Sequence, residues 1–336
     1  MKAAVLYRSD RPLVLEERPD PAPGPTEVVI RVQRCGICGS DLHANQGPVR
    51  EMPGGMVMGH EFAGEIVETG AEVTGLRKGQ LIAVYPSTGC GTCPACRTGN
   101  VNLCPQGAHI MGGYAEYASI PASVAVPLDE GLSAAHGALI EPLTVGLYGV
   151  RLAQIGPGDS VLVLGAGSVA LAAVYWARRL GAGRIVVLSR SDRRAAMALA
   201  MGADAFLRYG DDECAEAAEV LAGAPDIVLE CVGTPGMLGK AIDHCRPFGK
   251  VLSLGFCTLP DPIVPAVAGF KSATLQFPTG HTPADFRHVA RTMHSGHVDP
   301  AMMITAVIPL ADVPARFAAM LEVNADTKVQ IAPVAG

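Results

Sequence analysis

The most constraining feature of this chain is a glycine-rich turn that stands directly between a short apolar strand and a helix. The strand is expected at 160–164 and the helix at 169–180, and the turn between them reads Gly165-Ala-Gly-Ser-Val-Ala170. Gly165 permits a tight turn, Gly167 lets the backbone approach a pyrophosphate, and the helix start offers free N–H groups to an anion. A plain tight turn is the alternative. Further strands and helices of the same kind follow, at 184–188, 193–201, 226–229 and 250–254. This alternation predicts an α/β fold, a doubly wound parallel sheet with helices on both faces, and therefore favours a nucleotide site.

The end of the second strand of this sheet indicates which nucleotide is bound. An NAD site usually carries an acidic residue about 20 residues after the turn, where it accepts from the ribose 2′-hydroxyl. Here Ser189 stands at that place, and Arg190 follows at once. A serine and an arginine suit a 2′-phosphate, so NADP(H) is favoured over NAD(H), with a solvated basic helix start as the alternative. The predicted cofactor-binding residues are Gly165, Gly167, Ser168, Val169, Ser189, Arg190 and Arg194.

The first 130 residues have a different texture, with short apolar stretches separated by glycine and proline. Strands are expected at 27–33, 62–68 and 80–85. Many short strands with such turns predict a β domain of barrel type. With 336 residues, the chain is long enough for two domains.

Four of the ten cysteines form one compact motif, Cys90-x2-Cys93-x2-Cys96-x7-Cys104. Four thiolates at this spacing close a tetrahedral zinc site with no open position, so the site is expected to be structural. A zinc-finger role in nucleic-acid binding is the alternative, but Arg97 is the one base-reading candidate there. The cysteines at 214, 231, 245 and 257 are predicted to be small buried apolar residues.

A second group of metal-ligating residue types is more dispersed. Cys35, Cys38 and His43 come close together, and His60 and Glu61 follow. Cysteine, histidine and carboxylate suit a zinc ion that keeps one position for solvent or substrate. Each residue taken alone is also ordinary, as a buried cysteine, a loop histidine or a surface glutamate.

The motifs occur in the order seen in the zinc-dependent medium-chain alcohol dehydrogenases, and the chain resembles most closely their polyol (sorbitol) and threonine dehydrogenase branch. The resemblance covers essentially the whole chain and rests on Cys38-Gly-Ser-Asp-Leu-His43, Gly59-His-Glu61, the four-cysteine motif, Gly113-Tyr-Ala-Glu-Tyr117, Glu141-Pro142 and Gly165-Ala-Gly167. It implies a GroES-like catalytic domain at 1–146, with a structural zinc lobe at about 88–106. It also implies a Rossmann domain at 147–283 and a return to the catalytic domain at 284–336.

Carried over position by position, the resemblance makes Cys38, His60 and Glu61 ligands of a catalytic zinc. Cys38 is preferred to Cys35 because the order Cys-Gly-Ser-Asp-x-His begins there. Glu141 matches a glutamate that binds the zinc directly or through water. One catalytic and one structural zinc per chain are thus expected.

The resemblance also assigns a proton relay. Ser40 matches its hydroxyl and His43 its basic end, while Asp41 matches a residue that lies behind the ligands. Two departures from the family pattern are Ala170 in place of a third glycine and Ser189 in place of an acid. For the substrate, His109, Gln276, Phe277 and Thr279 are pocket candidates.

The expected function is hydride transfer between a nicotinamide cofactor and a secondary alcohol, polyol or sugar-like substrate, or its ketone. Alternatives are a general alcohol/ketone oxidoreductase that uses NAD(H), and a non-catalytic nucleotide-binding relative. A net charge of −6 argues against nucleic-acid binding. The chain has no apolar run of about 20 residues and its start turns polar too soon for a signal peptide, so a cytoplasmic location is expected. A homodimer or homotetramer is implied by the resemblance alone.

Overall fold

The computed structural model describes residues 1–8, 10–44, 54–322 and 326–333. The chain divides into two compact units. The first contains Met1–Glu141, Thr282–Ser295 and Pro300–Gly336, and the second contains Pro142–His281 and Gly296–Asp299. Both chain ends therefore belong to the first unit, whose last segments return after the second unit is complete.

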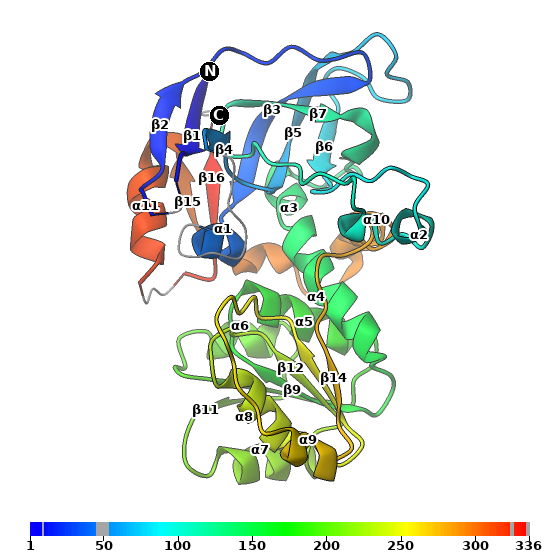
Figure 1. Ribbon diagram of the computed structural model, residues 1–336, viewed down its shortest axis with the longest axis vertical. Coiled ribbons are helices and arrows are strands. Elements are labelled where there is room, and N and C mark those ends of the chain that lie inside the picture. The colour runs from blue at the N-terminus through cyan, green and yellow to red at the C-terminus, as the bar shows by residue number, and fades with distance from the viewer. Residues whose placement is uncertain (9, 45–53, 323–325, 334–336) are drawn as a thin grey trace. The chain divides into compact units, whose positions relative to one another are not determined.

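The first unit is built on two sheets of short strands (Figure 1). One has the strand order β2-β1-β4, and the other has the order β15-β16-β3-β5-β6-β8, with β7 also paired to β3. The strands are β1 (Lys2–Leu6), β2 (Val14–Glu17), β3 (Glu27–Gly36), β4 (Met56–Val57), β5 (Glu61–Thr69), β6 (Leu81–Val84), β7 (Tyr117–Pro121), β8 (Ala125–Pro127), β15 (Ile304–Pro309) and β16 (Lys328–Ala332). The expected β-rich domain is present.

The long strands β3 and β5 form the centre of the larger sheet and run antiparallel, with Gly36 opposite Glu61. A Cβ atom at Gly36 would lie 1.9 Å from Glu61 Oε2, so the strand has room for that carboxylate because residue 36 is a glycine. On its other edge β3 pairs with β16, which brings residues from the end of the chain beside the start of β5.

Short helices connect these strands. They are α1 (Gly39–Ala44), α2 (Pro94–Arg97), α3 (Ala134–Gly137), α10 (Pro283–Thr292) and α11 (Val313–Met320), with 3-10 turns at Val101–Leu103, Ala122–Val124, Met293–Ser295, Pro300–Met303 and Leu310–Asp312. Side-chain caps begin three of them, and at α2 the Cys93 sulfur accepts from the Cys96 amide. The Ser133 hydroxyl accepts from the His136 amide at α3, and the Thr282 hydroxyl accepts from the Asp285 amide at α10.

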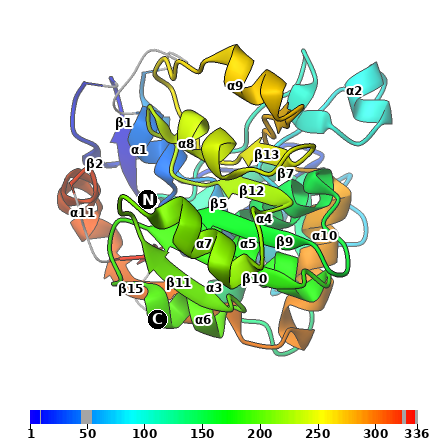
Figure 2. The same cartoon turned by 90° about the horizontal axis from the view of Figure 1, so that it is seen from below.

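The second unit is a six-stranded parallel sheet with the order β11-β10-β9-β12-β13-β14 (Figure 2). Its strands are β9 (Ser160–Leu164), β10 (Arg184–Ser189), β11 (Ala205–Arg208), β12 (Ile227–Glu230), β13 (Lys250–Ser253) and β14 (Thr274–Gln276). Its helices are α4 (Ile140–Ala153), α5 (Ser168–Arg179), α6 (Ala195–Ala200), α7 (Glu213–Leu221), α8 (Met237–His244) and α9 (Pro265–Phe270), of which α4 begins at the border between the units.

Alternate side chains of these strands face opposite sides of the sheet. Leu162 and Leu164 of β9 pack with Ala217 and Leu221 of α7 and with Ile242 of α8 in one apolar cluster. Helix α5, whose residues 170–177 are all buried, follows β9 directly. This is the doubly wound fold expected from the sequence, which is confirmed.

Among the described residues, no helix is both long enough and apolar enough to cross a membrane.

Candidate active site

Three predicted ligands meet at the end of β3 and the start of β5. Cys38 follows β3, His60 immediately precedes β5 and Glu61 begins it, and their ligand atoms lie within 4.8 Å of one another. We call these three residues the mixed cluster. A thiolate, an imidazole and a carboxylate are donors that zinc accepts, so the cluster fits the metal that the sequence analysis expects.

The histidine of the mixed cluster is held from behind. His60 Nδ1 lies 3.3 Å from Asp41 Oδ1, which leaves Nε2 as the nitrogen available to a metal. Asp41 is 2% exposed, and its Oδ2 accepts from the Tyr114 hydroxyl at 2.7 Å and the Cys38 amide at 3.1 Å. Burial opposes the charge of His60, but Asp41 and Cys38 together outweigh it and raise the pKa of the imidazole well above its ordinary value.

The carboxylate of the cluster is held by a lysine from the last strand. Lys328 Nζ donates to both carboxylate oxygens of Glu61, at 2.8 and 2.7 Å, and to the Ile37 carbonyl at 3.2 Å. Glu61 is 0% exposed and Lys328 is 1% exposed. Burial disfavours the charge of Lys328, but Glu61, Cys38 and Glu141 together outweigh it and raise the pKa of the ammonium. The sequence analysis did not identify Lys328, because no local pattern links it to a strand 267 residues away.

The structure separates the two cysteines between which the sequence motif had to choose. Cys35 is buried in β3, and its Sγ faces two glycines: a Cβ at Gly59 would lie 2.8 Å from that sulfur, and one at Gly113 would lie 2.4 Å from it. Cys35 thus packs against backbone, while Cys38 joins the mixed cluster.

The other residues predicted to lie around the metal, Glu141, Ser40 and His43, are not part of the mixed cluster. Glu141 is 7% exposed and close enough to act electrostatically on Glu61 and Lys328, although the mixed cluster within 4.8 Å does not include it. Ser40 lies in α1, half-buried, two residues after Cys38. The backbone of His43 lies in the same helix, and its side chain is outside the described part of the chain.

The four cysteines at 90–104 form a second group, which we call the lobe. Their sulfur atoms lie within 4.8 Å of one another. Backbone amides point at the sulfurs: Cys90 N donates to Cys104 Sγ at 3.3 Å and Cys93 N donates to Cys90 Sγ at 3.4 Å. A Cβ at Gly89 would lie 2.5 Å from Cys96 Sγ, so the absence of a side chain at residue 89 leaves room for this sulfur. The arrangement fits a closed four-thiolate zinc site.

In the second unit, the glycine turn lies where the sequence places it, between β9 and α5. Gly165 has φ +99°, which glycine adopts without strain, and Gly167 is the N-cap of α5. A Cβ at Gly167 would meet no atom within 4 Å, so space for a pyrophosphate lies over that residue. Ser168 and Val169 form the first turn of the helix and are half-buried, with their amides at its start.

The neighbouring strand ends at the residues predicted for the adenosine half. Ser189 ends β10 half-buried, Arg190 is exposed, and Arg194 is the N-cap residue of α6. Tyr209, which the sequence analysis missed, follows β11 and donates its amide to the Ser189 carbonyl at 3.1 Å. Its hydroxyl is buried and has no hydrogen-bond partner within the described structure. Burial raises the pKa of this phenol, and the charge of Arg190 opposes the shift in part.

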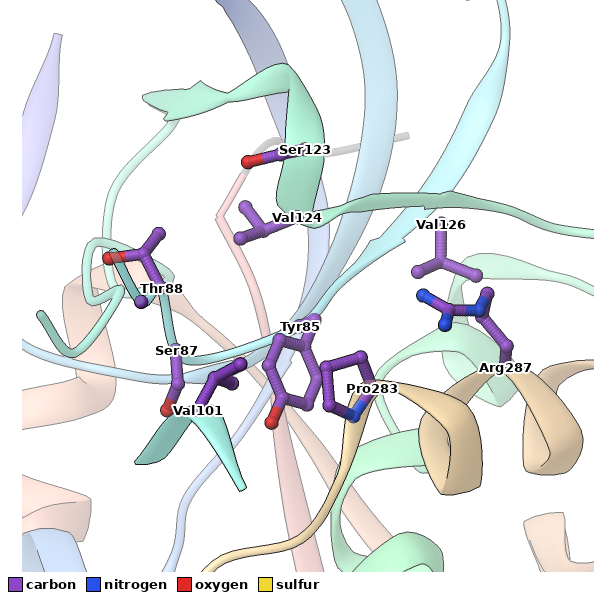
Figure 3. A pocket seen from close by; sticks show the side chains of 10 residues that line it. Tyr85, Ser87, Thr88, Val101, Ser123, Val124, Val126, Pro283 and Arg287 are labelled. Atoms are coloured by element: carbon purple, nitrogen blue, oxygen red, sulfur yellow. The ribbon is translucent and has the colours of Figure 1, made fainter. Parts of the chain in front are cut away.

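The first unit also has a pocket of about 190 Å³ beside the lobe, lined in part by Gly89 and Val101 (Figure 3). The ring of Tyr85 faces Pro283, and the Arg287 guanidinium lies beside Val126. The lining contains no carboxylate, imidazole or thiol, and none of the predicted site or substrate-pocket residues. It therefore offers no group for metal binding.

Comparison with known proteins identifies the family. Residues 24–130 match the alcohol dehydrogenase GroES-like domain, and residues 168–295 match the zinc-binding dehydrogenase domain. The chain is 32% identical to L-galactonate-5-dehydrogenase of Escherichia coli K12 over 91% of its own length and 92% of that protein. This chain is a zinc-binding dehydrogenase. The family that the sequence motifs indicate is thereby confirmed.

Two further similarities agree with this result. The dehydrogenase is 33% identical to sorbitol dehydrogenase of Bacillus subtilis, over 76% of this chain and 75% of that one. Its fold matches the solved structure of a Sinorhizobium meliloti 1021 protein bound to NADP with a TM-score of 0.87, at 29% identity over 99% of each chain.

Proposed function

We propose that this dehydrogenase transfers a hydride between a secondary alcohol, a polyol or a sugar-like substrate, or its ketone, and a nicotinamide cofactor. The observation that carries the proposal is the mixed cluster, in which Cys38, His60 and Glu61 bring three different donor types within 4.8 Å. Such a donor set leaves a zinc ion able to take a further ligand, whereas the lobe uses four thiolates and is closed. A bound zinc ion would supply a Lewis acid that polarises an alcohol or carbonyl oxygen.

The surrounding residues of this chain have supporting roles in the proposal. Asp41 orients His60, and Lys328 balances the charge of Glu61. Glu141 supplies a further carboxylate, directly or through water. Ser40 and His43 would carry the proton of the alcohol away from the site, because an imidazole is a suitable terminal base near neutral pH.

For the cofactor, we propose NADP(H) in preference to NAD(H), held at Gly165, Gly167, Ser168 and Val169. Ser189, Arg190 and Arg194 provide hydroxyl and guanidinium groups where an acid would repel a 2′-phosphate. The buried Tyr209 hydroxyl supports this choice, since a phosphate oxygen would satisfy a donor that is otherwise left without a partner. The relative bound to NADP is consistent with it.

Polyols are the favoured substrate class. The names of the related sorbitol and L-galactonate-5-dehydrogenases refer to polyhydroxylated compounds. A general alcohol/ketone oxidoreductase that uses NAD(H) is the alternative within this chemistry. A non-catalytic nucleotide-binding relative is the alternative outside it, and such a protein would hold one metal ion instead of two.

The experiment measures reduced-nicotinamide absorbance with zinc-loaded protein, NADP⁺ or NAD⁺, and a panel of polyols, sugars and simple alcohols. We expect turnover with polyols and NADP⁺, and two zinc ions per chain by elemental analysis. Arg190→Ala should weaken NADP⁺ binding about 10- to 100-fold and leave NAD⁺ binding within about twofold. Equal turnover with NADP⁺ and NAD⁺ by the unaltered enzyme would reject the NADP(H) preference. Faster turnover of simple alcohols than of polyols would reject polyols as the substrate class.

We propose in addition that the dehydrogenase is a cytoplasmic homo-oligomer, a dimer or tetramer. Strand β14 lies at the edge of the parallel sheet, and Phe270 and Phe277 beside it are 90% and 62% exposed. An open strand edge flanked by apolar side chains suits pairing with a second copy. None of the ten cysteines forms a disulfide in the structure, which is consistent with a reducing compartment. Sedimentation analysis tests the assembly.

A further inference from the structure

One buried carboxylate in the second unit belongs to none of the predicted sites. Glu230 is the last residue of β12, next to β9 in the sheet, and it is 2% exposed. The three residues before it, Ile227 to Leu229, are buried and apolar. A carboxylate at such a place is costly unless its oxygens are hydrogen-bonded, so the partners of Glu230 show what it is doing there.

The carboxylate binds the loop that follows its own strand. Glu230 Oε1 accepts from the amides of Val232 at 2.6 Å and Gly233 at 2.8 Å. Two amides on one charged oxygen fix the path of the chain as it leaves β12, because charge-assisted hydrogen bonds of this kind are strong.

The same residue also binds the loop after the neighbouring strand β13. Glu230 Oε2 accepts from the Ser253 hydroxyl at 2.9 Å, and the Glu230 carbonyl accepts from the amides of Leu254 at 2.6 Å and Gly255 at 2.9 Å. Glu230 is therefore the common anchor of two loops at the carboxyl edge of the sheet.

The two loops touch each other and the glycine turn. A Cβ at Gly255 would lie 2.2 Å from the Gly233 amide nitrogen, and one at Gly233, where φ is +71°, would lie 2.7 Å from the Phe256 nitrogen. A Cβ at Gly165 would lie 3.0 Å from Val232 Cγ2. A shift of either loop would therefore be passed on to its neighbours.

The strand order indicates which part of a bound dinucleotide would lie over these two loops. In a doubly wound sheet a dinucleotide lies across the carboxyl ends of the strands, at the point where the order reverses, which here is between β9 and β12. The proposed adenosine site lies at β10 and β11, so the nicotinamide half falls over the loops after β12 and β13. This step depends on the proposed function, which supplies the cofactor.

We propose that Glu230 is a positioning residue for the nicotinamide half of the cofactor. It acts through the backbone of residues 231–233 and 254–256, because it fixes the position of these two loops relative to each other at the carboxyl edge of the sheet. Without its carboxylate, the amides of Val232 and Gly233 and the Ser253 hydroxyl lose their acceptor, so the two loops are no longer joined through one side chain. The adenosine half, held at other strands, would keep its site.

The test compares two ligands on the full-length zinc-loaded enzyme. NADPH contains both halves of the cofactor, whereas 2′-phosphoadenosine 5′-diphosphoribose lacks the nicotinamide. Glu230→Ala should weaken NADPH binding about 10- to 100-fold and leave the fragment within about threefold, because small misplacements at a binding site are costly. Glu230→Gln retains an acceptor oxygen and should restore most of the NADPH affinity.

The matched control is Asp226→Asn at the opposite end of the same strand. Asp226 accepts from the Ser160 amide at 2.8 Å, the Ser160 hydroxyl at 2.6 Å and Arg246 Nε at 2.6 Å, so it is as well bonded as Glu230. Asp226→Asn should lower the melting temperature and leave both ligand affinities unchanged. Ser253→Ala, which removes a single bond to Glu230, should weaken NADPH binding about threefold even if Glu230→Ala does not fold.

The outcomes are distinguishable. If the unaltered enzyme binds neither ligand, the proposed dinucleotide function fails. If it binds both and the Glu230 or Ser253 variants weaken NADPH and the fragment equally, or weaken neither, the positioning role is overturned. An effect of Asp226→Asn on NADPH as large as that of Glu230→Ala would also overturn it, because it would reduce the role of Glu230 to general stability.

Discussion

The lobe and the mixed cluster solve the same problem, the placing of metal-ligating side chains, in opposite ways. All four ligands of the lobe lie between Cys90 and Cys104, and the backbone amides that point at its sulfurs come from the same segment. The mixed cluster takes its ligands from 38–61 but depends on Tyr114 through Asp41 and on Lys328 from the last strand.

The difference shows what each site requires of the fold. The sulfurs of the lobe are oriented by backbone amides of their own short segment, so the lobe needs no charged partner from a distant strand. The mixed cluster contains buried charges whose partners arrive only when β16 pairs with β3. A metal site that keeps one position for substrate contains buried charged side chains that the metal ligands alone do not balance. Residues from other parts of the fold must therefore provide the opposite charges and hydrogen bonds.

The largest effect that separates the two sites is expected from Lys328→Met. The variant leaves the Glu61 carboxylate buried without its cation, which costs about 3–5 kcal/mol of unfolding free energy. Urea denaturation measures the loss, and zinc retained in the lobe shows that the damage is confined to the mixed cluster. Glu65→Gln is the control, since Glu65 pairs with Arg31 at 2.7 Å on a partly exposed face and should cost less than about 1 kcal/mol. Equal losses in the two variants would contradict the assigned role of Lys328.

A smaller effect is expected from Asp41→Asn. The amide is a poorer partner for His60 Nδ1 than the carboxylate, so zinc affinity at the mixed cluster should fall about 10- to 100-fold. Competition with a coloured zinc chelator measures this affinity, with the lobe zinc of the same molecule as the internal reference. A matching fall at the lobe would mean that Asp41 supports the whole unit and does not act specifically on His60.

The contrast between the two sites also explains what could be predicted from the sequence. The lobe motif and the glycine turn depend on spacing within a short segment, so their residues could be named in advance. The sheet of the second unit was predicted for the same reason. A short apolar segment such as 160–164 that is followed by a helix indicates a buried strand of a parallel sheet. That prediction is confirmed.

Residues whose role depends on distant partners could not be named. Lys328, Tyr209 and Glu230 occupy ordinary positions at strand ends, and their importance comes from groups that other strands bring to them. The prediction that the scattered cysteines are buried is confirmed for Cys245 and wrong for Cys214, which lies exposed at the start of α7, while Cys231 and Cys257 are half-buried. Composition alone does not distinguish a cysteine in the first turn of α7 from one that follows the end of α8.

Removal of metal should occur in two steps. Soft thiolates bind zinc more firmly than a mixed set with a carboxylate, so a chelator should empty the mixed cluster about tenfold faster than the lobe. Activity should be lost in the first step, and the melting temperature should fall mainly in the second. Cys96→Ser serves as the control, because it should abolish the slow step alone. A single step with simultaneous loss of activity and stability would show that the two sites are not independent.

The smallest effect concerns the glycines next to the first cysteine of each site. Gly89→Ala places a Cβ 2.5 Å from Cys96 Sγ and 3.2 Å from Val101 Cβ, so the lobe must open slightly at a cost of about 1 kcal/mol. Gly39→Ala, beside Cys38, meets no atom within 4 Å and stands at the start of α1, so it should change stability by less than about 0.5 kcal/mol. Thermal unfolding of the two variants measures both values. A larger loss of stability in Gly39→Ala than in Gly89→Ala would contradict this prediction. It would mean that the lobe is loosely packed at Gly89 and that the mixed cluster is tightly enclosed beside Cys38.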